Sequence, residues 1–309
     1  MTRSTSTVVV RDVTLRDGLQ DESPLDTDHK LRIYDALLAA GVVDLELTSF
    51  VRADRVPALA DAEQLVARTA DNPHVTRWGL VLNERGAQRA VVAGIDHLQF
   101  VFSVSEPHNR ANAGCSVDES VERLRSVRDS IDTSVALEVT MATAFGCPYA
   151  GPVDAGRVVD LAKRVVELGI DGLSLADTIG TAAPSEVRRL VSLVRDDIGE
   201  LSLGVHLHDT RGLALANALT AIEAGITRVD ASLGGLGGCP FAPGASGNLP
   251  IEDLVHALDA EGIASGIDVD RLIDASRTAC SAVGRAVGSH VGIAGPRFEN
   301  LAPFDTPEQ

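Results

Sequence analysis

The sequence predicts an α/β fold, a (β/α)8 TIM barrel with an additional C-terminal helix. Three observations support this: a phrase that recurs four times, a further apolar run ahead of each repeat, and amphipathic helical patterns between the runs. Alternating strands and helices form parallel sheets, and eight such units in about 260 residues favour closure into a barrel over an open doubly wound sheet. The phrases are AAGVVDLEL (39–47), VAGIDHLQF (92–100), ELGIDGLSL (167–175) and EAGITRVDA (223–231).

Each phrase is interpreted as a helix end, a glycine and then a strand rich in β-branched residues. Its glycine suits the left-handed backbone position that commonly ends a helix. The four glycines are Gly41, Gly94, Gly169 and Gly225. Further apolar runs at 8–15, 76–83, 134–144 and 201–208 bring the number of expected strands to eight.

Between the strands, apolar residues recur at helical spacing in 31–38, 158–168 and 187–194. Ser116 and Glu119 carry the signature of a capping box at the start of another helix. After the eighth strand we expect helices at 249–262 and at about 268–288. We therefore predict a catalytic barrel over 1–265, and a C-terminal helix and tail over 266–309 packed on it rather than a separate domain.

Composition excludes several classes of protein. The 309 residues are 45% hydrophobic, which is enough for a substantial core, and 44 acidic against 27 basic side chains give a net charge of −17. Such a chain repels a phosphate backbone, so we expect no nucleic acid partner. The first residues lack an apolar signal segment and no apolar run is long enough for a bilayer, so we expect a cytoplasmic protein without membrane contact. Four irregularly spaced cysteines predict neither a disulfide framework nor a structural zinc site.

Polar side chains gather where the expected strands end. In a TIM barrel the catalytic groups lie at the C-terminal ends of the strands, so this pattern predicts a polar pocket at that face. The residues concerned are Arg16, Asp17, Glu46, Asn83, Ser103, Ser105, Glu106, Glu138, Thr140, Asp177, His206 and His208.

His206 and His208 lie two apart on one strand and so point to the same face. If that face is the lumen, Asp17 approaches from a strand two places round the barrel. The long glycine-rich loop 234–250 lies between them, with Asn248 near its far end. Two imidazoles, a carboxylate and an amide oxygen suit a six-coordinate Mg²⁺ or Mn²⁺, with Co²⁺ also possible. The alternative is a pair of ordinary interior histidines without a metal.

Cys239 lies in that loop, where a thiol can move a proton, although a free cysteine is more often a small buried apolar residue. The loop glycines can alternatively hold a phosphate, but Pro240 removes one N–H donor. Cys147 is interpreted as structural. The remaining histidines are expected at the surface: His29, His74, His97, His108, His256 and His290.

Taken together, these motifs resemble the 3-hydroxy-3-methylglutaryl-CoA lyase family, a group of metal-dependent TIM-barrel enzymes. The resemblance extends over residues 8 to 285, and the loop GLGGCPFAPGASGN is its most specific part. The segments that carry it are TLRDGLQDE (14–22), ELTSFV (46–51), FGCPYAG (145–151), LADTIGTAAP (175–184), VHLHDTRGLALAN (205–217) and GLGGCPFAPGASGNLPIEDLV (235–255).

The resemblance implies roles for individual residues. The metal ligands would be Asp17, His206, His208 and Asn248. The catalytic residues would be Arg16, Cys239, Asp177 and Glu46, with Glu46 supporting the metal shell. Substrate contacts would come from Arg16, Gln20, Asp177 and Thr178. The resemblance also implies an acyl-CoA substrate and a homodimer.

The implied reaction cleaves the carbon–carbon bond of 3-hydroxy-3-methylglutaryl-CoA, or of a related 3-hydroxyacyl-CoA, into acetyl-CoA and a keto acid. A divalent ion would stabilise the substrate alkoxide and Arg16 the departing enolate, while Cys239 would protonate the enolate carbon. Asp177, Glu46 or a water would take the hydroxyl proton.

Two other functions remain open at this point. One is a condensing acyltransferase of the isopropylmalate or homocitrate synthase type, which would use acetyl-CoA and a 2-keto acid. Those relatives usually have RDGEQ, whereas this chain has Leu19. The other is a barrel kept only for binding. The chain departs from the lyase pattern at Asp21 and Ser23, at 52–58 and at Arg211, and these departures concern the substrate rather than the type of reaction.

Overall fold

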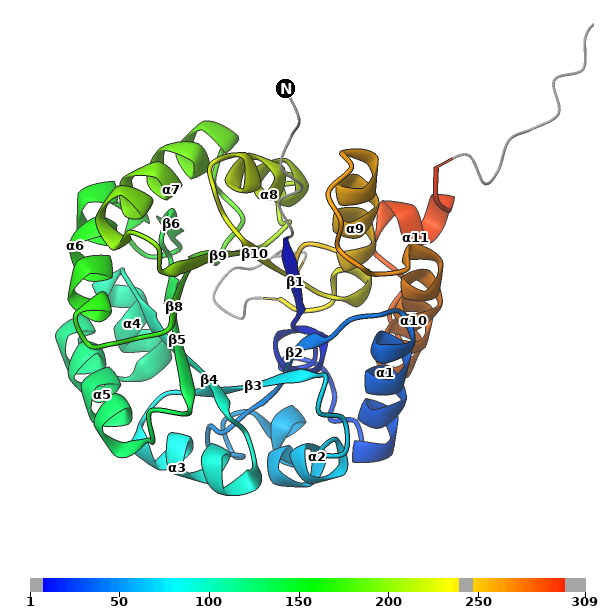
Figure 1. The fold of residues 1–309 in the computed structure, drawn as a ribbon, viewed down its shortest axis with the longest axis horizontal. Coiled ribbons are helices and arrows are strands. Elements are labelled where there is room, and N and C mark those ends of the chain that lie inside the picture. Colours follow the sequence, from blue (N-terminus) through cyan, green and yellow to red (C-terminus); the bar gives the residue numbers. More distant parts are fainter. Residues whose placement is uncertain (1–7, 239–246, 298–309) are drawn as a thin grey trace, which may run out of the picture.

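The fold is a closed barrel of eight parallel strands in a computed structural model, which describes residues 8–238 and 247–297 (Figure 1). Going round the barrel, the order is β1, β10, β9, β8, β5, β4, β3 and β2. This confirms the predicted TIM barrel and excludes the alternative prediction, an open doubly wound sheet. The strands are β1 (Val9–Asp12), β2 (Asp44–Ser49), β3 (Thr76–Val81), β4 (His97–Ser103), β5 (Ala136–Ala142), β8 (Gly172–Asp177), β9 (Ser202–Leu207) and β10 (Arg228–Ala231).

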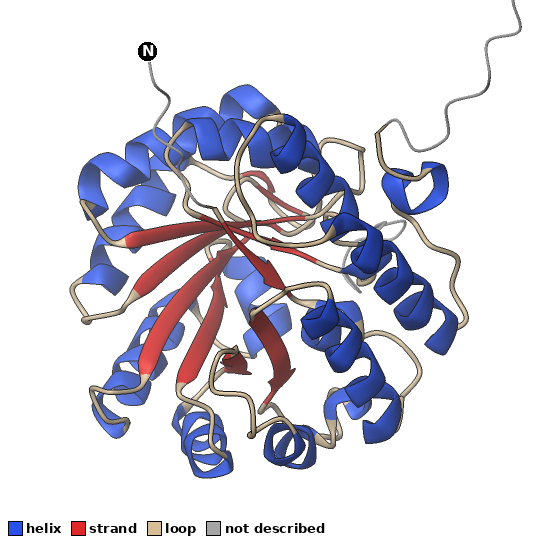
Figure 2. Ribbon diagram, turned by 45° about the vertical axis from the view of Figure 1, so that its right-hand side comes forward, coloured by secondary structure: helices blue, strands red, loops and turns tan. Residues whose placement is uncertain are grey.

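The helices form an outer ring around the strands (Figure 2). No helix within the described ranges is long and apolar enough to cross a membrane. A two-stranded hairpin outside the barrel, β6 (Gly146–Cys147) and β7 (Gly151–Pro152), was not predicted. The helices are α1 (Thr27–Ala39), α2 (Ala62–Arg68), α3 (Glu84–Ala93), α4 (Glu106–Ala113), α5 (Val117–Ser130), α6 (Ala155–Val166), α7 (Pro184–Ile198), α8 (Ala214–Glu223), α9 (Ile251–Ala260), α10 (Val269–Ala282) and α11 (His290–Ala294).

Local signals in the sequence behave as expected. Gly41, Gly94, Gly169 and Gly225 all have positive φ, between 73° and 100°, which an L side chain rarely adopts. Ser116 accepts a hydrogen bond from the Glu119 backbone, and the Glu119 side chain accepts one from the Ser116 backbone, so α5 begins with the predicted capping box.

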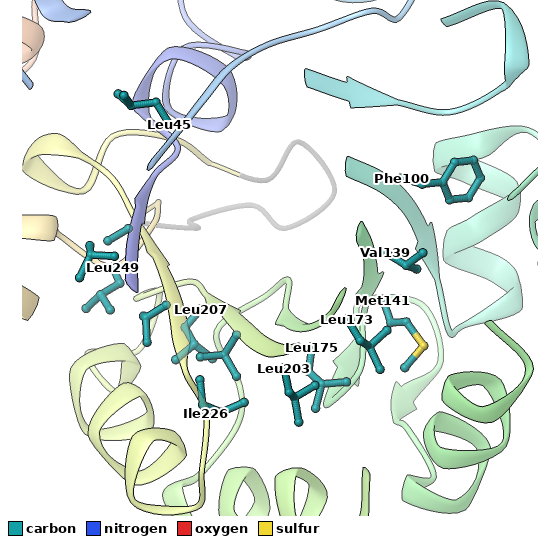
Figure 3. Close-up of a cluster of buried hydrophobic side chains, with 14 of the residues drawn as sticks. Leu45, Phe100, Val139, Met141, Leu173, Leu175, Leu203, Leu207, Ile226 and Leu249 are labelled. Atoms are coloured by element: carbon teal, nitrogen blue, oxygen red, sulfur yellow. The ribbon is translucent and has the colours of Figure 1, made fainter. Parts of the chain in front are cut away.

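Alternation along the strands separates two environments. On β5, β8 and β9, one set of side chains points outward into an apolar layer against the helices, where Val139, Leu173 and Leu203 are fully buried (Figure 3). The other set, which includes Glu138 and His206, points into the lumen. Burial of the apolar layer drives closure of the barrel, and the polar set is left inside it.

The C-terminal region differs from the prediction in one respect. α10 packs against α1, and the backbone N–H of Asp268 donates to Ala40 O at 2.8 Å. The helix predicted over 268–288 ends at Ala282, because Gly284 takes a left-handed φ of 72°. The chain then forms the separate short helix α11, so the predicted length was wrong.

Candidate active site

A cavity of about 580 Å³ opens at the C-terminal ends of the barrel strands. Its wall contains Arg16, Asp17, Asn83, Thr140, His206 and His208 from the predicted ring. The other members of the predicted ring are not among its lining residues: Glu46, Ser103, Ser105, Glu106, Glu138 and Asp177. The sequence pattern therefore gave the correct face of the barrel but too many residues on the pocket wall.

Three buried side chains form a cluster with the geometry of a metal site. The ligand atoms of Asp17, His206 and His208 all lie within 4.8 Å of one another. The Nε2 atoms of the two histidines are 3.2 Å apart, and Asp17 Oδ2 lies 3.7 Å from His208 Nε2 and 4.0 Å from His206 Nε2. Asp17 lies on a single π-helical turn, Thr14–Gly18, that directly follows β1.

Asn248 joins this cluster from the loop after β10. Its side-chain amide donates to Asp17 Oδ2 at 2.7 Å and to Leu236 O at 2.9 Å, and both amide hydrogens are used in this way. The carbonyl oxygen is therefore the atom that Asn248 can offer to a cation. Gly237 has a φ of 119°, and a Cβ there would lie 2.4 Å from the Asn248 amide nitrogen, so the glycine makes this close approach possible.

Arg16 lies beside Asp17 and is held by two carboxylates. Its Nε donates to Glu46 Oε2 at 2.6 Å, and its Nη1 donates to Asp17 Oδ1. Gln20, also on the cavity wall, donates to the same Asp17 oxygen at 3.1 Å. Burial raises the pKa of Glu46, and the pair with Arg16 opposes that change.

The cluster keeps Asp17 ionised. Burial alone would raise its pKa, but the Arg16 guanidinium and the two histidines outweigh burial and hold the pKa well below its usual range. Burial lowers the pKa of His206, while its contact with Asp230 and the charge of Asp17 raise it, and the net direction is upward. Asp17 is therefore an anionic ligand at neutral pH.

The donor set fits a divalent cation. Two ligand atoms bound at right angles to one ion, with bonds of about 2.1 Å, lie about 3 Å apart. The two imidazole nitrogens, 3.2 Å apart, match this separation. The charges of the lumen agree with this. Three guanidinium groups and five carboxylates are linked by contacts and leave a net charge of −2, and all of them except the partly exposed Asp44 are buried. A divalent ion cancels this charge, and an uncompensated buried charge is costly. The groups are Arg11, Arg16, Arg228, Asp17, Asp44, Glu46, Glu138 and Asp230.

The structure does not bring the Asp177 carboxylate to the cavity. Its two oxygens accept hydrogen bonds from the backbone N–H groups of Thr181 at 3.0 Å and Ala182 at 2.9 Å, so it shapes the loop after β8. Thr178 does line the cavity, and its hydroxyl accepts from the Thr143 backbone. Cys239 lies outside the described residues; the residue before it in the sequence, Gly238, lines the cavity.

The sequence analysis missed two residues at the site. The surface assignment of His108 is wrong, because it is 2% exposed on α4, lines the cavity and contacts Ser103 Oγ at 2.7 Å. Burial lowers the pKa of His108 to about 4, so this ring is neutral at physiological pH. The second residue is Asp230 on β10, which contacts His206. Alternation along this strand could have shown that Asp230 faces the lumen beside the histidine pair.

The rim of the cavity is basic although the chain is acidic. Arg52, Arg55 and Arg123 line the cavity in addition to the buried Arg16, while the net charge of the whole chain is −17. Arg52 and Arg55 belong to the segment where the sequence departs from the lyase pattern. A concentration of guanidinium groups at one opening favours a substrate with several negative charges.

Comparison with known proteins identifies the family. The HMGL-like family model matches residues 7–279. The chain is 38% identical over 289 residues to the mitochondrial hydroxymethylglutaryl-CoA lyase of Mus musculus, covering 93% of this chain and 89% of that protein. It is also 38% identical over 312 residues to the (R)-citramalyl-CoA lyase of Chloroflexus aurantiacus, covering 96% and 98%.

Solved structures agree. An HMG-CoA lyase from Acinetobacter baumannii, in complex with coenzyme A and 3-methylmalate, has a TM-score of 0.93 and 39% identity, covering 99% of this chain and all of that one. The hydroxymethylglutaryl-CoA lyase from Pseudomonas aeruginosa has a TM-score of 0.90 and 35% identity, covering 94% and 97%. With a metal-ligand cluster at the barrel mouth and this similarity along nearly its whole length, the chain belongs to the HMGL-like family.

Proposed function

We propose that this protein is a divalent-metal-dependent carbon–carbon lyase. It cleaves 3-hydroxy-3-methylglutaryl-CoA, or a related 3-hydroxyacyl-CoA, to acetyl-CoA and a keto acid. The observation that carries the proposal is the buried cluster of Asp17, His206 and His208 beside Arg16 on the cavity wall. Full-length similarity to proteins named as hydroxymethylglutaryl-CoA and citramalyl-CoA lyases supports the reaction class.

The ion would be held by Asp17, His206, His208 and the Asn248 carbonyl oxygen, and Mg²⁺ or Mn²⁺ suits this mixed set, with Co²⁺ also possible. When bound, it supplies Lewis-acid stabilisation to the substrate oxygen that loses its proton. Asp17 orients the site through its bonds from Arg16, Gln20 and Asn248.

Arg16 stabilises the negative charge that develops on the departing acyl fragment. Its guanidinium is on the cavity wall, and its bonds to Glu46 and Asp17 fix its position before the substrate arrives. A donor that is already oriented needs no rearrangement during the reaction, which is why such groups lower barriers. Glu46 thus acts by holding Arg16, and Asp177 by holding the loop that carries Thr178.

Cys239 is the proposed proton donor to the enolate carbon. Support comes from both ends of its loop. Gly238, which precedes it in the sequence, lines the cavity, and Asn248 at the other end contacts Asp17. With Glu46 and Asp177 off the cavity wall, the hydroxyl proton passes to a water molecule.

The basic rim supports coenzyme A as the carrier of the acyl group. Coenzyme A carries phosphates, which pair with guanidinium groups, and Arg52, Arg55 and Arg123 line the opening. A relative with 39% identity was solved with coenzyme A bound. The relatives named above are lyases, which favours cleavage over the condensing alternative.

The proposal is tested by mass spectrometry of products from 3-hydroxy-3-methylglutaryl-CoA, from citramalyl-CoA and from longer 3-hydroxyacyl-CoA analogues. We expect acetyl-CoA to form only with a divalent ion, and EDTA to stop the reaction. Release of free coenzyme A from acetyl-CoA and a 2-keto acid, with no cleavage of any thioester, would favour the condensing enzyme. No reaction in either assay would refute the proposal.

Three further features belong to the same proposal. The described part of the C-terminal segment, residues 266–297, belongs to the barrel domain, since Leu272, Ala275 and Ala279 join the main core. The protein is a homodimer, as the family resemblance implies, and light scattering of the purified chain tests this. It acts in the cytoplasm, although relatives include both cytoplasmic and mitochondrial proteins, and cell fractionation distinguishes the two.

A further inference from the structure

We propose that five charged side chains in the barrel lumen, below His206, position this histidine and set the metal affinity of the site. We call them the lumen network: Asp44, Arg11, Glu138, Arg228 and Asp230. None of the five is a ligand in the cluster of Asp17, His206 and His208. The inference rests on the proposed metal site and concerns how that site is oriented and charged.

The contact with His206 comes first. Asp230 Oδ2 lies 3.3 Å from His206 Nδ1, while the opposite nitrogen, Nε2, faces His208 and Asp17. A carboxylate on one ring nitrogen keeps the proton there and leaves the lone pair of the other for a metal. Asp230 therefore selects the tautomer and fixes the angle of the ring.

Asp230 is in turn held by charges deeper in the barrel. Arg228 Nε lies 3.8 Å from Asp230 Oδ1, and Arg228 Nη1 donates to Glu138 Oε1 at 2.5 Å. Arg11 donates to the other Glu138 oxygen at 2.9 Å and to Asp44 Oδ1 at 2.7 Å. The result is a continuous series of contacts from the opposite end of the lumen up to His206.

The network is built into the fold rather than placed on its surface. Arg11, Glu138, Arg228 and Asp230 are each at most 5% exposed. Arg11 also stacks on Trp78, with its guanidinium carbon 3.7 Å from the ring centroid. Charges in such surroundings are weakly screened, so a change at one of them is felt at the next.

Two strand glycines make room for the network. A Cβ at Gly204 would lie 2.6 Å from Arg228 Nη2, and a Cβ at Gly172 would lie 2.8 Å from Glu138 Oε1. These glycines face the lumen on β9 and β8, where glycine otherwise weakens a strand. They allow the Arg228 and Glu138 side chains to cross the lumen below His206.

Electrostatics give the sign of the effect. Glu138 balances Arg228 and Arg11, so the Glu138→Gln variant leaves two guanidinium groups with one fewer anion. Arg228 then pairs more strongly with Asp230 and withdraws negative charge from His206. The weaker interaction of Asp230 with His206 lowers the affinity of the site for a cation.

The test measures Mn²⁺ affinity from the EPR signal of free Mn²⁺, without any substrate. We expect Asp230→Asn to weaken binding about 10- to 100-fold, and Glu138→Gln about threefold or more. When both substitutions are combined, Glu138→Gln should add little to the loss of affinity caused by Asp230→Asn, because Glu138 acts through Asp230. Thermal unfolding of each metal-free variant checks the fold, and Asp230→Asn alone tests the contact with His206 if Glu138→Gln does not fold.

Asp61→Asn is the matched control. It also removes one carboxylate from an ion pair, with the buried Lys30, but outside the barrel lumen. Unchanged Mn²⁺ affinity in Glu138→Gln, full additivity in the double variant, or an equal loss in Asp61→Asn would overturn the inference. Absence of Mn²⁺ binding by the unmodified protein would instead refute the proposed metal site itself.

Discussion

Glu252 offers a sharp test of how the loop after β10 is anchored. This carboxylate is fully buried in the first turn of α9, and its oxygens accept from the Gly234 backbone N–H at 2.9 and 3.1 Å. Gly234 begins the loop that ends at Asn248. The perturbation is Glu252→Gln, which removes the charge but keeps an oxygen to accept the hydrogen bond.

The magnitude follows from the pKa of Glu252, which burial raises from 4.5 to about 7. Between these two pH values the folded protein keeps a proton that the unfolded chain has lost. Stability therefore falls as pH rises through this window, by about 3 kcal/mol in total, and changes no further above pH 7. The glutamine variant does not titrate, so its stability relative to the unmodified protein should rise by this amount between about pH 4 and pH 8.

Urea unfolding of the metal-free proteins, followed by fluorescence of the single tryptophan, Trp78, measures both free energies of unfolding across the pH range. Glu167→Gln, an exposed position on the surface, is the control and should leave the pH dependence unchanged. The reasoning is refuted if Glu252→Gln gains no stability relative to the unmodified protein between pH 4 and 8. It is also refuted if the control gains as much.

Three further predictions concern the site. Cys239→Ser should fold and bind Mn²⁺ yet lose most turnover with 3-hydroxy-3-methylglutaryl-CoA, whereas normal turnover would remove the thiol from the mechanism. His208→Ala should lose Mn²⁺ binding as well as turnover, as calorimetry can show, and retained micromolar binding would contradict its assignment as a ligand. Gly237→Ala should weaken Mn²⁺ binding tenfold or more, because its Cβ would clash with Asn248. Gly262→Ala, also at positive φ but in open space, should leave binding unaltered while costing about 1 kcal/mol of stability.

The sequence predicted the barrel because its signals are local. A glycine with positive φ at a helix end depends only on neighbouring residues, and so does a capping box. The shared face of His206 and His208 follows from alternation within one strand. Asp17 could be added because strand order in a closed barrel is fixed by chain order.

How deep a side chain lies in the lumen could not be predicted in the same way. Glu138 faces inward, as alternation requires, but it contacts Arg11 and Arg228 below the site instead of the cavity. The register between strands decides this, and no single strand encodes it. His108 was missed for a related reason, since α4 is a short polar helix and the burial of His108 comes from packing against β4, where it contacts Ser103.

The central claim is that Asp17, His206 and His208 hold one divalent ion at the mouth of the barrel. Anomalous diffraction from crystals grown with Mn²⁺ tests it most directly. We expect a single strong peak at about 2.0 to 2.3 Å from one atom of each of the three side chains. A peak elsewhere, or none at this cluster with the histidine rings turned toward the outer helices, would contradict the account.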